Sequence, residues 1–194
     1  MLMKKLSELV DFVSGSPQFR ITESFDEQAP LYNFYSQTDL SDDLVGLVSS
    51  DNDNKQIRTL DKVNTLCPKD VVFSLTSGTA SLVREVHKNY LYTQNYVKID
   101  PKDSIDSKYL IYLLNEDKVI RKQLMMGLQG SQVLKYTLKQ LKELEIPKPP
   151  SIEKQKNIGN VYFNLLRLRA LRNRVAESET IILLKRLEEV TTNE

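Results

Sequence analysis

The side chains that most often perform catalysis are sparse in this sequence, and their spacing forms no known catalytic pattern. The chain contains one histidine, His87, and one cysteine, Cys67. The serines around Gly78 do not form the Gly-x-Ser-x-Gly turn of a hydrolase, and no nearby histidine and acid would activate them. We therefore interpret His87 as a surface or turn residue and Cys67 as a small apolar residue beside a turn.

Metal-dependent and nucleotide-dependent chemistry also lack their usual patterns. A single histidine and a single cysteine argue against a structural zinc site within one chain, and neither a P-loop nor a Gly-x-Gly-x-x-Gly sequence occurs. Acid-x-Lys triplets of the kind found in nucleases occur at Asp53/Lys55, Asp100/Lys102, Asp106/Lys108 and Glu116/Lys118, but none follows a Pro-Asp pair. A metal-dependent nuclease remains the enzymatic alternative. Our prediction is a binding protein with no catalytic residues, no metal and no cofactor.

Groups that recognise nucleic acid are more abundant and fall in three stretches. Arg and Gln can contact guanine and adenine edges, lysines neutralise phosphates, and small residues around a glycine let backbone amides approach a phosphate. The alternative for each stretch is an ordinary polar loop, an unliganded hairpin or a solvated helix face. The residues that we select as candidate DNA contacts are Arg20, Gln37, Ser77, Thr79, Gln94, Arg121, Lys122, Gln129, Ser131 and Lys135.

The formal net charge of +1 conceals an uneven distribution of charge along the chain. Residues 20–61 contain 3 basic and 9 acidic residues, whereas residues 118–148 contain 7 basic and 2 acidic residues. Segregation of this kind can give a nearly neutral protein one basic face for a polyanion. The alternative is that both segments are solvated surface.

The elements that must position these groups can be predicted from apolar spacing. A length of 194 residues with 40% hydrophobic and 27% charged residues fits one globular domain plus an additional element. Helical spacing predicts a short helix over residues 6–13, a longer one from Tyr109 to Leu124 ending at Gly127, and a short one over residues 138–144. Extended segments are predicted at 71–75, 82–86, 95–99, 133–138 and 146–150.

The last segment differs from the rest because no proline and no glycine after Gly159 interrupts it. Ser151 is a suitable N-cap, and a helix of about 40 residues from there would span about 60 Å. A domain of this size cannot cover such a helix, so we expect a partner helix to do so. The residues that we expect at that contact are Val161, Leu165, Leu168, Val175 and Ile182. Arg172, Glu179 and Arg186 interrupt the heptad pattern, and the alternative is an edge helix packed on its own domain.

The sequence also bears on where the protein resides. No apolar run approaches the roughly 20 residues of a membrane-spanning helix, so we expect no membrane association. The N-terminal sequence lacks the apolar core of a signal peptide, and one cysteine is compatible with a reducing compartment. We therefore expect a cytoplasmic protein.

An ordered series of short motifs resembles the DNA-specificity (S) subunit of type I restriction-modification systems. The series includes a leucine-rich short helix, then Ile-Pro-x-Pro-Pro at 146–150, followed by Gln155 and Ile158. Each piece is weak alone, but together they cover nearly the whole chain. The earlier pieces are Gly15-Ser16-Pro17-Gln18, Lys69-Asp70-Val71-Val72-Phe73-Ser74, Gln94-Asn95, Tyr109-Leu110-Ile111-Tyr112-Leu113-Leu114-Asn115 and Gln129-Gly130-Ser131.

The resemblance implies an α+β fold with one mixed α/β target-recognition domain, residues 1–150, and a long C-terminal helix, residues 151–194. In the family, two such domains read the two halves of a split DNA site, and their helices pair in an antiparallel coiled coil. The family's S subunit also bridges two methyltransferase (M) subunits, with a motor-nuclease (R) subunit joining them, and so directs DNA methylation. This chain has half the usual length, which is compatible with a homodimer formed through the helix.

Two readings therefore follow from the sequence. The first is a half-length specificity subunit that binds double-stranded DNA and docks methyltransferase subunits without catalysis of its own. The second is a non-catalytic regulatory protein that pairs with a full specificity or methyltransferase subunit and binds DNA weakly. Salt-dependent binding of DNA by the chain alone distinguishes the two, because phosphate neutralisation supplies most non-specific DNA affinity.

Overall fold

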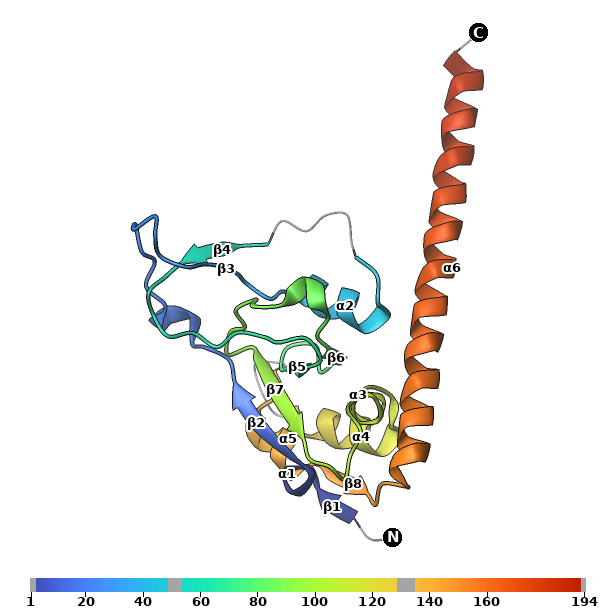
Figure 1. The fold of residues 1–194 in the computed structure, drawn as a ribbon. Coiled ribbons are helices and arrows are strands. Elements are labelled where there is room, and N and C mark those ends of the chain that lie inside the picture. The colour runs from blue at the N-terminus through green and yellow to red at the C-terminus, as the bar shows by residue number, and fades with distance from the viewer. Residues whose placement is uncertain (1–2, 49–53, 129–134, 193–194) are drawn as a thin grey trace.

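The computed structural model describes residues 3–48, 54–128 and 135–192, which form a globular domain and a long C-terminal helix (Figure 1). The elements are, in order, β1 (Met3–Lys5), α1 (Leu6–Leu9), β2 (Val10–Ser14), η1 (Gln18–Arg20), β3 (Leu31–Asn33), α2 (Gln37–Val45), β4 (Gln56–Arg58), β5 (Val71–Ser74), β6 (Ala80–Leu82), η2 (Glu85–His87), β7 (Tyr96–Pro101), α3 (Ser107–Glu116), α4 (Lys118–Met126), α5 (Leu138–Glu143), β8 (Glu145–Pro147) and α6 (Ile152–Thr192). This is the mixed α+β architecture that the sequence predicted.

A four-stranded antiparallel sheet with the order β2-β7-β5-β6 organises the domain. Its central strand β5 is buried along its whole length. Val71 and Phe73 pack into the larger hydrophobic core with α3, α4 and the first turns of α6, whereas Val72 packs into a second core that contains Tyr35 and Tyr92. Burial on both faces explains why this strand has a continuous apolar sequence rather than alternating polarity.

Two predicted elements differ from the structure near the N-terminus and along the sheet. The segment 6–13 forms one helical turn and then strand β2, because Val10 to Ser14 pair with β7 instead of continuing the helix. The predicted returning strand at 82–86 begins earlier, at Ala80, and ends at Leu82. The predicted extended segment at 133–138 lies partly outside the described residues, and its described part leads into α5.

The long helix predicted from Tyr109 to Leu124 is divided in two at Asp117. The Asp117 backbone is extended, and its carboxylate accepts hydrogen bonds from the amides of Val119 and Ile120, which makes it the N-cap of α4. Asp106 caps α3 in the same way, through the amides of Lys108 and Tyr109. The aspartate that starts the second helix therefore ends the first one, a capping signal that apolar spacing alone does not reveal.

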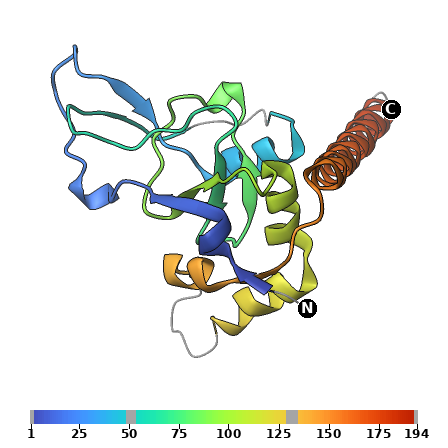
Figure 2. The same cartoon turned by 60° about the horizontal axis from the view of Figure 1, so that its bottom comes forward.

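Helix α6 begins at Ile152 and continues for 41 residues, as predicted. Figures 1 and 2 show its first turns against the domain and its remainder extending well beyond it. Gly159 permits the close contact with α3, because a Cβ there would lie 2.5 Å from the Cβ of Lys108. Tyr162 belongs to the larger core. The division of the chain at residue 150 stays a prediction, and the first turns of α6 pack as part of the domain.

Candidate DNA interface and pairing helix

The turn between β5 and β6 is held in shape by hydrogen bonds within it. The Ser74 hydroxyl accepts the amides of Thr76 and Ser77, and the Gly78 amide donates to the Ser74 carbonyl. Gly78 adopts a left-handed conformation with φ 67°, and the Tyr136 ring occupies the space that a Cβ would need. These amides are therefore already bonded, so any phosphate contact at this turn falls to side chains rather than to the backbone that the sequence suggested.

Several of the candidate DNA contacts converge on this turn from separate elements. The Gln37 amide oxygen, at the start of α2, accepts from the Ser74 hydroxyl at 3.0 Å. Arg121 of α4 donates to the Gly78 carbonyl at 2.6 Å. Lys135 donates to the Asn95 side chain at 2.7 Å, and the Asn95 carbonyl in turn accepts the Leu75 amide. Of the candidate contacts, Ser77 and Thr79 therefore lie in the turn and Gln37 and Arg121 bond to it. Lys135 bonds to Asn95 beside the turn, and Gln94 precedes Asn95 in the sequence.

The remaining candidates are placed differently. Arg20 lies in η1 beside the β3–β4 arm, with its guanidinium 5.5 Å from the centroid of the exposed Phe19 ring. Figure 1 shows η1 and this arm on the side of the domain away from α4. Lys122 is exposed on α4. Gln129 and Ser131 lie outside the described residues.

The lysines of α4 and α5 have no acidic partner among the ion pairs of the described residues. Within the described ranges, Lys118, Lys122, Lys139 and Lys142 are exposed and none of them forms an ion pair. A reciprocal pair of hydrogen bonds between Gln123 and the Glu145 backbone fixes α4 against β8, beside α5. These lysines, together with Arg121 and Lys135, form what we call the α4–α5 basic group.

The acidic segment contributes less surface charge than its sequence suggests, because Asp39, Asp42 and Asp43 are buried in α2. Removing these three negative charges from the formal net charge of +1 leaves +4 on the remaining residues. These carboxylates therefore cannot contact a partner directly, although their charge still contributes to the field of the molecule.

A buried ionic cluster stands behind the turn, and sequence reasoning missed it. His87 is only 1% exposed, and its two ring nitrogens lie 2.8 Å from Asp43 Oδ1 and 3.2 Å from Asp39 Oδ1. The expectation of a surface histidine was therefore wrong, although His87 does lie in a turn, the 3-10 helix η2. The carboxylates stand four residues apart on α2, but the histidine comes from η2, so only the fold brings them together.

The protonation state of this cluster follows from its contacts. Burial alone would lower the pKa of His87, but the hydrogen bonds to Asp39 and Asp43 outweigh burial and raise the pKa to about 9. Burial and Asp43 raise the pKa of Tyr35 well above its usual value, and the Tyr35 hydroxyl donates to Asp43 at 2.8 Å. Both ring nitrogens of the His87 imidazolium face buried carboxylates, so the ring presents no free nitrogen that could accept a proton from solvent. We assign the cluster a structural role, because it joins α2 to η2.

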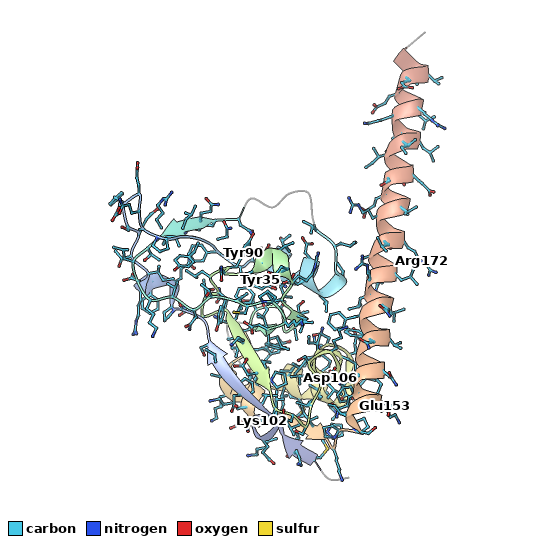
Figure 3. The ribbon with its side chains drawn as sticks, viewed as in Figure 1. Tyr35, Tyr90, Lys102, Asp106, Glu153 and Arg172 are labelled. Carbon is cyan, nitrogen blue, oxygen red and sulfur yellow. The ribbon has the colours of Figure 1, made fainter. Side chains whose placement is uncertain are left out.

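The motif residue Gln155 has a clear structural role at the base of α6. It is 1% exposed, accepts the Asp106 amide at 2.9 Å and donates to the carbonyls of Ser104 and Pro150. These bonds join the first turn of α6 to the start of α3, near Asp106 and Glu153 in Figure 3. The Gln-x-x-Ile signature thus fixes the angle at which the long helix leaves the domain.

The exposed part of α6 carries the apolar residues expected to meet a partner. Beyond Ala170, each α6 residue whose side chain the structure describes is exposed. An apolar cavity of about 400 Å³ also lies between α3 and α6, lined by Tyr112, Asn157, Ile158, Val161, Tyr162 and Leu165. The exposed large apolar residues of α6 are Ile152, Val161, Leu165, Leu168, Leu171, Val175, Ile181, Ile182, Leu183, Leu184, Leu187 and Val190.

Two further properties concern the described part of the chain. Among residues 3–48, 54–128 and 135–192, no group of three or more His, Cys, Asp or Glu side chains is arranged to hold a metal ion. None of the helices in those ranges combines the length and apolarity needed to cross a bilayer.

The described residues thus form a sheet-based domain with basic helices beside a polar turn, followed by a long exposed helix. The chain belongs to the type I restriction modification DNA specificity domain family, whose model matches residues 3–178. No curated protein sequence shows significant similarity to it.

Solved structures of specificity subunits share this fold. The HsdS subunit from Thermoanaerobacter tengcongensis superposes with a TM-score of 0.60 at 21% identity, over 96% of this chain and 42% of that one. A chain from a study of complex assembly and conformational transition of the type I R-M system gives a TM-score of 0.62 at 22% identity, over 96% and 43%. The S subunit from M. genitalium gives 0.52 at 20% identity, over 95% and 42%. The present chain therefore spans less than half the length of these relatives.

Proposed function

We propose that the chain is a sequence-specific DNA-binding specificity subunit that reads one half-site and carries out no catalysis itself. The observation that carries this proposal is the family membership together with the convergence of polar and basic side chains on the β5–β6 turn. In this proposal the α4–α5 basic group neutralises phosphates, and exposed residues such as Ser77 and Gln94 read base edges. Gln37 supports the turn through Ser74, and Arg121 both holds the Gly78 carbonyl and contributes its charge to the basic group.

We further propose that α6 pairs two copies of the chain. Two-fold pairing would supply the second recognition domain that the longer relatives have room for, since this chain covers about 42% of their length. Two identical domains held at a fixed separation would select an interrupted palindrome. The exposed apolar residues of α6 support this pairing, because a row of that length is unfavourable in water.

Docking of methyltransferase subunits, with a motor-nuclease subunit joining them, is part of the same proposal. Ile181 is 54% exposed and lies on the face of α6 opposite Val161 and Leu165, and Leu184, 55% exposed, lies to one side of that face. Self-pairing through one face leaves these residues accessible to a different subunit. The alternative is a regulatory chain that pairs with a full specificity or methyltransferase subunit and binds DNA weakly. The exposed lysines of the α4–α5 basic group favour direct DNA binding over that alternative.

Salt-dependent DNA binding tests this proposal. We expect the pure chain to bind duplex DNA in fluorescence anisotropy, and Lys122→Gln/Lys135→Gln to lower the slope of log affinity against log salt by about 2, or roughly 0.9 per phosphate contact. The matched control is Lys88→Gln/Lys185→Gln, which removes the same charge from the residue after η2 and from α6 and should leave the slope unchanged. Equal slopes for both variants would place the DNA elsewhere. If the chain does not bind DNA but co-purifies with methyltransferase subunits, that result would support the regulatory alternative.

A further inference from the structure

A groove lined by basic residues runs between the first turns of α6 and the globular domain. Two adjoining cavities of about 330 Å³ and 290 Å³ form it, and Leu82 of β6 and Lys108 of α3 line both. Figure 1 shows α2 and α3 on the side of the domain that faces α6. We call this space the α6 groove; its cationic residues are Lys69, Arg84, Lys108, Lys156 and Arg167.

The charges of these five residues are not cancelled by acidic side chains. Among the described residues, none of the five forms an ion pair. The Lys108 ammonium donates to the Asn160 side chain at 2.8 Å and lies 5.7 Å from the centroid of the Phe163 ring. The Arg84 guanidinium donates to the Leu47 carbonyl at 2.8 Å. Neutral partners therefore orient these two groups and leave their positive charge available to a ligand.

Two carboxylates also line the groove, and both are bonded within the fold. Asp106 accepts two backbone amides as the N-cap of α3. Asp43 is buried, contacts His87 at 2.8 Å and accepts the Tyr35 hydroxyl. The five cations of the groove therefore outnumber its two anions, and protonated His87 offsets one of the latter. A cleft lined mainly by one sign of charge focuses the electric field and attracts ions of the opposite sign.

The backbone of Lys69 is an independent feature of the groove. Its φ of 73° lies in the left-handed region, which glycine and asparagine adopt more readily than lysine. The turn is fixed on both sides, because the Lys69 amide donates to the Val83 carbonyl and the Asp70 amide donates to the Cys67 carbonyl. A lysine at this position therefore costs stability that asparagine would not. Its side chain nevertheless lines the groove.

We propose that the α6 groove binds a small phosphorylated molecule, a nucleoside triphosphate, with its phosphates in the cavity of the three lysines and its base in the neighbouring cavity. Lysine ammonium groups are strong hydrogen-bond donors to phosphate. In the second cavity, Leu82 and Phe163 offer apolar contact to a flat ring, and Asn164 offers polar groups to its edge. The two cavities together fall within the roughly 300–1,000 Å³ of typical ligand sites. This proposal does not depend on the proposed DNA binding.

The groove is separate from the candidate DNA interface. Lys108 and Asn115 stand near opposite ends of α3, roughly 10 Å apart along the helix. Asn115 accepts the Ala80 amide at 2.8 Å, beside the β5–β6 turn, whereas Lys108 lines the groove. A duplex presents its phosphates on a convex surface, but the groove cations line a concave space between α6 and the domain. A small ligand fits this shape better than a duplex does.

A ligand in the groove would contact α2, β6, α3 and α6 together. The Gln155 side chain already joins the first turn of α6 to the start of α3. The ligand would add contacts further along the helix, from Lys156 to Arg167, and would hold α6 more firmly at its angle to the domain. We therefore expect a saturating nucleotide to raise the Tm of the chain by several degrees, because it binds the folded state alone.

Isothermal titration calorimetry tests the proposal, with metal-free ATP and GTP as the probes and the full chain in the cell. We expect one nucleotide to bind per chain. Adenosine should not bind measurably, because it lacks phosphates, and inorganic triphosphate should bind more weakly, because it leaves the second cavity empty. No binding of either nucleotide at millimolar concentrations would overturn the proposal. Triphosphate bound as tightly as ATP would indicate an adventitious ion only, and would overturn it as well.

A pair of double variants locates the bound nucleotide. Lys69→Asn/Lys156→Gln should raise the dissociation constant about tenfold or more, because it removes two phosphate donors. The fold should be retained, since asparagine accepts the backbone conformation of Lys69 and Lys156 is exposed on α6. The matched control, Lys122→Gln/Lys135→Gln, removes the same charge from the α4–α5 basic group and should leave nucleotide affinity unchanged. Equal losses in the two variants would indicate non-specific attraction and contradict the proposed site.

The same variants distinguish free nucleotide from DNA as the source of phosphate. In fluorescence anisotropy, the salt dependence of DNA binding should be unchanged in Lys69→Asn/Lys156→Gln, and duplex DNA should not displace ATP. If the duplex displaces ATP and this variant lowers the salt slope, the DNA backbone occupies the groove and the proposal fails. The two readouts are independent, so absent nucleotide binding leaves the DNA-binding proposal intact, and absent DNA binding leaves the nucleotide site intact.

Discussion

At the scale of single residues, the side chains that appeared chemically interesting turn out to hold the molecule together. His87 joins α2 to η2 through Asp39 and Asp43, and Gln155 joins α6 to α3. Neither role could be predicted from spacing in the sequence, because the partners of His87 are more than 40 residues away. Gln155 was recognised only as part of a motif, and the structure supplies the hydrogen bonds that explain it.

The charged state of His87 predicts how stability depends on pH. Its pKa in the folded chain is about 9, above the 6.5 of a free histidine, so protonation stabilises the fold. This stabilisation, of order 3 kcal/mol, is fully present below pH 6.5 and is lost as the pH rises through 9. We therefore expect the free energy of unfolding in urea to fall between pH 6.5 and 9.5.

An NMR titration checks this assignment directly, because His87 is the only histidine in the chain. Its ring resonances should titrate with a midpoint near 9. A midpoint near 6.5 would show that the imidazole is not held between two ionised carboxylates. On the acid side, burial alone would raise the Asp39 pKa, but the bonds from His87 and Ser36 lower it, so stability should also decline as the carboxylate is protonated.

At the scale of elements, the sequence predicted whether a segment is a helix or a strand better than it predicted where each element begins and ends. Strand β5 and helix α6 were predicted well because burial on both faces gives β5 an unbroken apolar run and because no proline interrupts α6. The break between α3 and α4 was missed because Asp117 ends one apolar helix and caps the next. The single turn α1 was predicted too long because pairing of β2 with β7 overrides local helical spacing.

The contact between α3 and α6 predicts a cost for adding one methyl group. In Gly159→Ala, the new Cβ would lie 2.5 Å from the Lys108 Cβ and 2.8 Å from the Tyr109 amide nitrogen, so α3 must shift. We expect a loss of about 1–2 kcal/mol in the free energy of unfolding, even though alanine favours a helix by about 1 kcal/mol. The measurement is chemical denaturation, with the exposed α6 substitution Ser178→Ala as the control. Unchanged or increased stability would mean that α3 and α6 are not in tight contact.

At the scale of the whole molecule, the chain is a recognition domain on a long arm. Figure 1 shows α6 carrying its C-terminal end far from the sheet. The candidate DNA contacts were predicted from residue chemistry, and the structure places four of the ten, Gln37, Ser77, Thr79 and Arg121, in one turn or bonded to it. Charge counting along the sequence could not foresee that three aspartates of the acidic segment are buried. Which contacts read bases stays a prediction.

We propose that two copies of the chain, paired through α6, read a split DNA site. Selection from a pool of random duplexes by the purified full-length chain tests it most directly. We predict enrichment of an interrupted inverted repeat with one fixed spacer, because two identical domains are related by a two-fold axis at a set distance. Enrichment of a single unrepeated half-site, or no enrichment above non-specific binding, would contradict the claim.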